Sequence, residues 1–322
     1  MRVAMTNLVQ PPAATSQTIP HQPAHPHPAH PQPTFPWWRG WLPVIAFPCL
    51  VAFATPPTWP AWALMWTFAL AIYGGCKWLT WRRTPTHGAS PWKQAGYLLA
   101  WPGMDAVSFF DASRTVAAPR TAEWLFASGK FAAGLSLAFV VTSAAPAENS
   151  YWFGWLGVVA IAMLLHFGVF HLLSCTWRAL GVNAQPLMNW PAASENLSEF
   201  WGRRWNMAFR DLTYRFLFRP LTARLGPRPA LFVGFVVSGL IHDAVISFPA
   251  RGGYGGPTIY FLIQALGLFV ERSRVGRKLG LGAKGRGWIF TMIVLLAPVP
   301  LLFHKPFVDS VIIPFMQALG AV

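Results

Sequence analysis

The chain has 322 residues, of which 54% are hydrophobic and only 11% are charged, whereas soluble domains carry about 25% charged residues. Its apolar residues recur in long runs, which excludes one soluble core and predicts helices that face lipid. The formal net charge is +15, but the basic residues lie between the apolar runs. We therefore interpret them as charges that set membrane topology, and we expect membrane lipids and no nucleic acid as partners.

Residues 1–36 are rich in Pro, His, Gln and Ala, and a segment of this composition cannot bury a core. We predict a disordered tail here, followed by one transmembrane domain over residues 37–322. The tail contains His21, His25, His27 and His30. These side chains could bind a metal weakly, but a flexible tail is the favoured interpretation. We expect no signal peptide, because there is no apolar run near Met1.

The apolar runs predict an all-α, polytopic membrane protein with about seven or eight transmembrane helices. The predicted spans are Trp41–Thr55, Trp59–Leu79, Glu123–Ser143, Trp152–Trp177, Pro229–Phe248, Pro257–Val270, Trp288–Phe303 and a weaker Val308–Leu319. Residues 84–120 mix aromatic and polar side chains, which is typical of an interfacial or re-entrant segment. Residues 178–228 form the longest internal loop, which we expect to be partly helical, and a basic, glycine-rich loop covers 271–287.

The distribution of Lys and Arg tests these spans, because basic residues concentrate in cytoplasmic loops. Of the 25 basic residues, 20 lie in the loops after the second, fourth and sixth spans, and the alternate loops hold only Arg251 and Lys305. This alternation places the N-terminus and the motif loop 178–228 in the cytoplasm. The compact length and the bias toward Ala, Arg, Pro and Trp favour a bacterial cytoplasmic membrane.

Several reactive side chains lie in apolar surroundings without a recognisable site. The three cysteines, which we expect to be buried small hydrophobes, are Cys49, Cys76 and Cys175. His166 and His171 are five residues apart, so packing or an interhelical hydrogen bond is expected for them. His304 stands at the end of a span and is expected to be interfacial. The sequence has no phosphate loop, zinc-type histidine pair, nucleophile elbow or dinucleotide fingerprint, so we expect no metal and no bound cofactor.

One candidate site follows Ser194. If the chain is helical there, one apolar stripe is formed by Leu197, Trp201, Trp205, Ala208 and Leu212. Ser194 would be the N-cap, Glu199 would pair with Arg203, and Asn206 would share the face of Arg203. Such a stripe suits a helix lying in the membrane interface. A simple interfacial anchor explains the Trp and Arg residues equally well, but it does not require Asn206.

The second candidate site is His242 with Asp243, inside the fifth predicted span. A charged residue at the centre of a span costs about 2.5–3.5 kcal/mol, so such residues usually face the interior and mark a site. Gly234, Ser238 and His242 share one helical face, which would let a helix or a substrate approach the imidazole. The alternative is a histidine that only forms a hydrogen bond between helices.

The stretch 196–206, Asn-Leu-Ser-Glu-Phe-Trp-Gly-Arg-Arg-Trp-Asn, resembles the Phe-Trp-x-Arg-Arg-Trp-Asn element of membrane-bound O-acyltransferases of the wax synthase type. Residues 238–243, Ser-Gly-Leu-Ile-His-Asp, resemble the Ser-Gly-x-x-His element of that family. Plant members commonly carry Glu after the histidine, where this chain has Asp243. The resemblance covers residues 190–270, and the other spans match only in hydropathy and number.

The resemblance implies that Asn206 and His242 are the active-site pair, with acyl-CoA as cosubstrate and a lipidic alcohol as acceptor. His242 would take the hydroxyl proton as the alcohol attacks the thioester carbonyl. Asn206 would orient the donor or the histidine. The further candidates for binding substrate or coenzyme A are Trp201, Arg203, Arg204, Trp205, Arg210, Ser238 and Asp243. The arginines are equally explained as topogenic or as facing lipid headgroups.

Two other functions remain open at this point. Adjacent His and Asp residues in a span would also suit a proton-coupled transporter, although the chain has no internal repeat with interrupted spans. A catalytically inactive, lipid-binding protein of the same family is the second alternative. The presence of both Asn206 and His242 argues against it.

Overall fold

The computed structural model describes residues 38–320, apart from 39, 87 and 144–149. The predicted tail 1–36 and its histidines lie outside the described residues. All regular secondary structure in the described part of the chain is helical, which confirms the all-α class.

The first predicted spans and the segment between them coincide with helices α1 Leu42–Ala54, α2 Ala61–Arg82, α3 Pro91–Leu99, α4 Ala106–Phe110, α5 Thr121–Ser143, α6 Ser150–Ile161, the π-helix η2 Ala162–Val169 and α7 Phe170–Ala179. The predicted loop 178–228 is largely helical, with η3 Pro191–Ala193, α8 Leu197–Glu199, the π-helix η4 Phe200–Arg204, α9 Met207–Thr213, the π-helix η5 Tyr214–Phe218 and α10 Arg219–Leu225. The remainder comprises α11 Pro227–His242, the π-helix η6 Asp243–Ser247, α12 Phe248–Ala250, α13 Gly256–Arg272, α14 Arg274–Leu279, α15 Arg286–Leu296, α16 Val299–Leu302, α17 Lys305–Phe307, the π-helix η7 Val308–Ile312 and α18 Ile313–Ala318.

Two helices in the described part are long and apolar enough to cross a membrane, namely Tyr151–Ala179 and Pro227–Ala250. The count rises to three if Arg286–Leu302 and Lys305–Ala318, which are bent by 61°, form one span. This is fewer than the seven or eight spans predicted. The other helices are shorter or more polar: α1 has 13 residues and α13 has 17, while α2 carries four Trp residues and a Lys.

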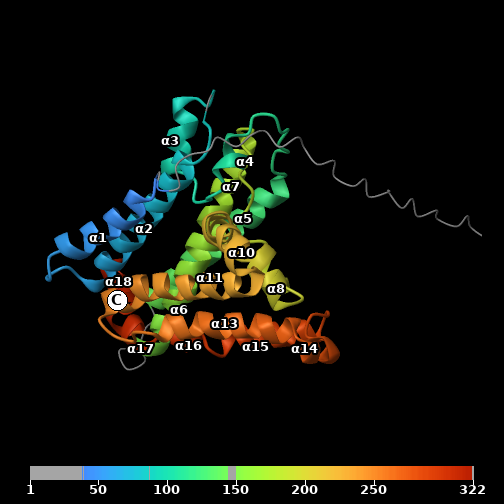
Figure 1. Ribbon diagram of the computed structural model, residues 1–322. Helices are drawn as coiled ribbons and strands as arrows, with labels where there is room; N and C mark the ends of the chain where they lie inside the picture. The colour runs from blue at the N-terminus through green and yellow to red at the C-terminus, as the bar shows by residue number, and fades with distance from the viewer. Residues whose placement is uncertain (1–37, 39, 87, 144–149, 321–322) are drawn as a thin grey trace, which may run out of the picture. The chain divides into compact units, whose positions relative to one another are not determined.

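Close helix packing depends on small residues. Helices α11 and α13 run side by side (Figure 1), and a Cβ at Gly239 of α11 would lie only 2.6 Å from the Cα of Thr258 in α13. Gly75 has the same role between α2 and α1, since a Cβ there would lie 2.7 Å from the Cα of Val44. Without a side chain at these positions, the helix backbones can approach closely.

The segment 84–120, which we predicted to be interfacial or re-entrant, packs several of its side chains into a core. Tyr97 and Phe109 are fully buried. Lys77 lies inside α2 and donates a hydrogen bond of 2.7 Å to the carbonyl of Gly103. Its ammonium also lies 3.2 Å from the centre of the Tyr97 ring. The carbonyl and the ring compensate for burying this charge.

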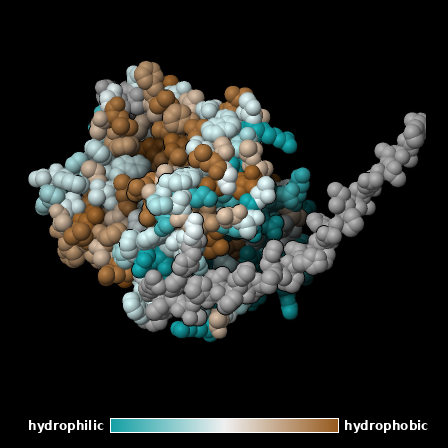
Figure 2. Space-filling model, turned by 90° about the horizontal axis from the view of Figure 1, so that it is seen from above, coloured by the Kyte–Doolittle hydropathy of each residue, from teal (hydrophilic) through white to brown (hydrophobic). Residues whose placement is uncertain are grey.

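The two long basic loops lie together, as expected if both face the cytoplasm. Asn196 donates to the carbonyl of Gly282 at 3.2 Å, and the indole of Trp288 donates to the carbonyl of Ala192 at 2.8 Å. Helices α8 and α14 therefore lie at the same end of the α11–α13 pair (Figure 1). Figure 2 shows hydrophilic residues gathered toward that end and hydrophobic residues over much of the remaining visible face.

The other cysteine and histidine expectations have mixed outcomes. Cys76 and Cys175 are buried as predicted, but Cys49 is exposed because α1 buries none of its residues. The interhelical hydrogen bond predicted for the histidine pair is confirmed for His171, whose Nε2 lies 3.1 Å from Glu123 Oε1 of α5. His304, which we predicted to be interfacial, is buried among neighbouring side chains.

Candidate active site

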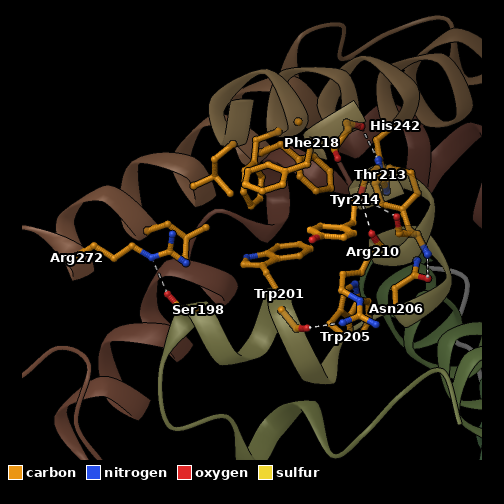
Figure 3. A pocket seen from close by; sticks show the side chains of 18 residues that line it. Ser198, Trp201, Trp205, Asn206, Arg210, Thr213, Tyr214, Phe218, His242 and Arg272 are labelled. Carbon is orange, nitrogen blue, oxygen red and sulfur yellow. Dashed lines mark hydrogen bonds between the residues drawn. The ribbon is translucent and has the colours of Figure 1, made fainter. Parts of the chain in front are cut away.

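A cavity of ≈ 400 Å³ lies between residues 198–218 and helices α11 and α13. Asn206 and His242, the predicted active-site pair, both line it. Figure 3 shows these two side chains at one end of the cavity and Arg272 with Ser198 at the other. The fold thus brings two distant sequence motifs to one hollow.

The imidazole of His242 is held in a defined tautomer. Its Nδ1 lies 2.7 Å from the backbone carbonyl of Ser238, one turn earlier in α11. Because a carbonyl can only accept, Nδ1 carries the proton and Nε2 keeps its lone pair. The ring packs on Phe261, with 4.5 Å between the ring centres, and it is half-buried. His242 therefore presents a proton acceptor in a largely apolar hollow.

We had predicted that the helix continues through Asn206, but Asn206 interrupts it. Its backbone is left-handed, with φ of 43°, a conformation that Asn tolerates better than most residues. The side chain is the N-cap of α9, where Oδ1 accepts from the N–H of Phe209 at 3.1 Å. Since the amide oxygen is engaged there, the amide has its NH₂ group left to offer a substrate.

A π-helical turn changes the pairing expected near the first motif. Asn196, and not Ser194, is the N-cap, and its Oδ1 accepts from the N–H of Glu199 at 2.8 Å. In η4 the hydrogen bonds link residues five apart, as in the 2.9 Å bond from Trp205 N–H to Phe200 O. The wider turn places Arg204, instead of Arg203, 2.7 Å from the carboxylate of Glu199.

Ionisation of Glu199 is shifted by this local structure. Burial by itself would raise the pKa of the carboxyl, but hydrogen bonds from the Glu195 N–H and the Arg204 guanidinium hold the pKa below its usual value. Arg204 also donates to the carbonyls of Asn189 and Trp190, both at 3.3 Å. Arg204 therefore holds the backbone of the motif in place.

The further substrate-binding candidates divide into two groups. Trp201, Trp205, Arg210 and Ser238 line the cavity together with Asn206 and His242. Arg203, Arg204 and Asp243 do not. Arg203 lines a second, more polar hollow of ≈ 460 Å³, which shares the side chain of Arg210 with the first.

Asp243 lies directly after His242 but serves as an anchor. Its carboxylate accepts from the N–H groups of Gly255 at 2.8 Å and Thr258 at 3.0 Å, from the Thr258 hydroxyl, and from Ser247 Oγ at 2.9 Å. Buried His304 continues the chain, with Nε2 at 3.0 Å from Ser247 Oγ. The carboxylate thus ties the end of α11 to the start of α13 and fixes the position of the histidine.

Glu271 is a further important residue that the sequence analysis missed. It is buried at the end of α13 and accepts from Leu197 N–H at 2.6 Å, Ser198 N–H at 3.3 Å and Ser198 Oγ at 2.5 Å. A carboxylate at a helix N-terminus also complements its dipole. The available signal was its rarity, since the chain has only 10 acidic residues.

Within the described residues, one group has the donor types of a metal site: Glu123, His171 and Cys175, whose ligand atoms lie within 4.8 Å of one another. Two cations already face it, because the Arg178 guanidinium pairs with Glu123 and the Lys130 ammonium lies 2.6 Å from His171 Nδ1. The local charge suits an ion-pair network and does not fit a bound cation.

Residues 184–263, which include both members of the predicted active-site pair, match the model of the membrane bound O-acyl transferase family. The match is confined to this segment, which is therefore similar to that family, and the similar curated proteins include long-chain-alcohol O-fatty-acyltransferases. The chain is 36% identical over 80 residues to a long-chain-alcohol O-fatty-acyltransferase of Simmondsia chinensis, covering 22% of this chain and 23% of the relative. An acyl-CoA–sterol O-acyltransferase of Arabidopsis thaliana is 30% identical over 101 residues, covering 28% of this chain and 29% of the relative. The similarity thus spans less than a third of these curated relatives.

Proposed function

We propose that this protein is a membrane O-acyltransferase that transfers an acyl group from acyl-CoA to the hydroxyl of a lipidic alcohol. The observation that carries the proposal is the meeting of His242 and Asn206 in one cavity, with the imidazole proton held on Nδ1 by the Ser238 carbonyl. The names of the similar plant proteins, which act on long-chain alcohols or sterols, support this class of reaction.

The proposed reaction needs no covalent enzyme intermediate. His242 Nε2 takes the hydroxyl proton while the alcohol oxygen attacks the thioester carbonyl. Negative charge develops on the carbonyl oxygen, where the NH₂ group of Asn206 would stabilise it. The carbon–sulfur bond then breaks, the ester leaves, and the imidazolium returns the proton to the coenzyme A thiolate.

We place the donor on the basic side of the protein. Arg203 lines the polar hollow that adjoins the cavity, and guanidinium groups suit the phosphates of coenzyme A. The proposed arrangement is a bacterial cytoplasmic membrane, crossed seven or eight times, with the N-terminus and residues 178–228 in the cytoplasm. The alternation of basic loops and the presence of a helix at each predicted span support it.

The test is acyl transfer by purified protein in lipid nanodiscs, with labelled palmitoyl-CoA and hexadecanol. Replacing His242 with Ala should lower turnover about 10²–10⁴-fold, because the general base is lost. His166→Ala is the matched control, since this histidine also lies in a span but does not line the cavity. Near-wild-type turnover of folded His242→Ala would overturn the proposed function.

A further inference from the structure

Two glycines of α11 have opposite surroundings. Gly239 faces the backbone of α13, and a Cβ there would collide with Thr258. Gly234 lines the cavity, and a Cβ there would meet no atom within 4 Å. Helix packing therefore explains Gly239 but gives no reason for glycine at position 234.

Glycine at position 234 also has a cost. It lies inside α11, where glycine is less favourable than alanine by roughly 0.5–1 kcal/mol. Its backbone is helical, so no unusual conformation requires it. What Gly234 provides is open space in the cavity, about 12 Å along the helix axis from His242.

The walls beside this space are apolar. Leu231 and Phe235 flank it on α11, and Trp201 lines the cavity from η4. The labelled polar side chains His242 and Asn206 lie at one end of the view in Figure 3, with Trp201 between them and Arg272. A polar portion of a ligand would find no hydrogen-bond partners on these apolar walls, whereas an alkyl chain needs none.

The free space continues beyond Gly234. A second apolar hollow of ≈ 740 Å³ shares Phe218, Leu231 and Arg272 with the cavity. It is further lined by Phe232 and Phe269. A chain that passes Gly234 would therefore find more apolar surface past Leu231.

We propose that Gly234 is a specificity-determining residue, whose missing side chain lets a long alkyl chain of one substrate run from His242 along α11 toward Leu231. This inference rests on the proposed acyl transfer. The alkyl chain can belong to the acyl donor or to the alcohol, and these two sources predict different results.

The test compares wild type with Gly234→Leu. One series pairs butyryl-CoA or palmitoyl-CoA with a fixed alcohol, and the other pairs butanol or hexadecanol with a fixed donor. We expect the long-to-short ratio of kcat/KM to fall about tenfold or more in one series, which identifies the substrate that lies there.

Gly129→Leu is the matched control, because Gly129 also has no atom within 4 Å of its Cβ position but does not line the cavity. Unchanged ratios in both series, or an equal loss for short and long chains, would overturn the inference.

A binding measurement separates this inference from the proposed reaction. If wild type forms no ester, photo-crosslinking with diazirine-bearing hexadecanol and palmitoyl-CoA still tests the cavity. Labelling of residues 228–242 should disappear in Gly234→Leu and persist in Gly129→Leu, and the inference fails if neither probe labels wild type there.

Thermal unfolding tests for a packing role of Gly234. Gly234→Ala should unfold at the wild-type temperature or above, so a lower unfolding temperature would reveal a packing role and contradict the inference.

Discussion

Asn206 has a structural role and a proposed catalytic role, and the two can be separated by mutation. Its oxygen caps α9, and its NH₂ group is the part of the amide that is left for a substrate oxygen. Aspartate, like asparagine, accepts hydrogen bonds at an N-cap and tolerates a left-handed backbone, but it has no NH₂ group. A change to Asp therefore tests the donor while it preserves the cap.

We predict that Asn206→Asp folds normally and loses about 10²–10³-fold in turnover, as expected for removal of one oxyanion donor. Asn206→Gly, which keeps the backbone conformation but loses cap and donor, should in addition unfold at a lower temperature. The measurements are acyl transfer and thermal unfolding in nanodiscs. Full turnover by the Asp variant would show that the amide NH₂ has no catalytic part.

For individual residues, the sequence predicted that His242 and Asn206 would lie close together, but it did not predict the backbone conformation and ion pairs that position them. The cost of a polar residue in an apolar span singled out His242, and the structure places it in the cavity with Asn206. The sequence could not predict the left-handed backbone of Asn206, because the break in the helix depends on its tertiary contacts. The Arg204 pair was missed for a related reason, since only the π-helical turn makes residues five apart neighbours.

At the scale of elements, α8 depends on Glu271 from another part of the chain. This three-residue helix is too short to be stable by itself, and its first N–H groups bond to the Glu271 carboxylate. The carboxylate therefore anchors the segment that leads to Asn206 onto α13.

Glu271→Ala should lower the unfolding free energy by about 1–3 kcal/mol for each buried donor that loses its partner. Glu271→Gln should be milder, because its amide oxygen still accepts. Glu195→Ala is the matched control, since this exposed glutamate has its nearest salt-bridge partner, Lys284, only at 4.0 Å. Equal thermal unfolding of Glu271→Ala and Glu195→Ala would contradict the anchoring role.

The Glu199–Arg204 pair predicts a pH dependence of stability. The folded protein lowers the pKa of Glu199, so its contribution is complete above the unfolded pKa of about 4.3 and is lost as the pH falls through the folded value. Glu199→Gln should consequently unfold at a lower temperature than wild type at neutral pH, and the difference should vanish in acid. A difference that persists unchanged at low pH would assign the effect to packing.

Element positions followed closely from hydropathy, whereas only two or three helices in the described residues are long and apolar enough to span a membrane, fewer than the seven or eight predicted. The predicted span Pro229–Phe248 corresponds to α11 and its extension, which end at Ala250. The packed core formed by part of the segment 84–120 was not predicted, because alternating aromatic and polar residues suit a membrane interface and a packed aromatic core equally well. The contacts of Lys77 with Tyr97 and Gly103 join α2 to this segment, and they cannot be recognised from either part of the sequence alone.

At the scale of the whole described molecule, α13 separates two groups of loops. Its amino end follows the loop with Tyr254, and its carboxyl end leads to the basic loop with Ala283, both of which are exposed. Its 17 residues span about 26 Å, close to the thickness of a hydrocarbon core.

We predict that these two loops face opposite sides of the membrane. In a background with Cys49→Ser, which removes the exposed native thiol, Ala283→Cys should react with an impermeant maleimide only from the cytoplasmic side. Tyr254→Cys should react only from the opposite side. Labelling of both variants from one side would exclude α13 as a span.

The π-helical turn η6, which immediately follows His242, has a consequence for insertions and deletions. Each residue of an α-helix turns the chain by about 100°, so deleting one residue between Ser238 and His242 would rotate the imidazole out of the cavity. A deletion within 244–246, which spares Asp243 and Ser247, would instead convert the wide turn to an ordinary one and leave His242 facing the same way. Among related sequences, insertions and deletions should therefore occur after this histidine and not in the turn before it.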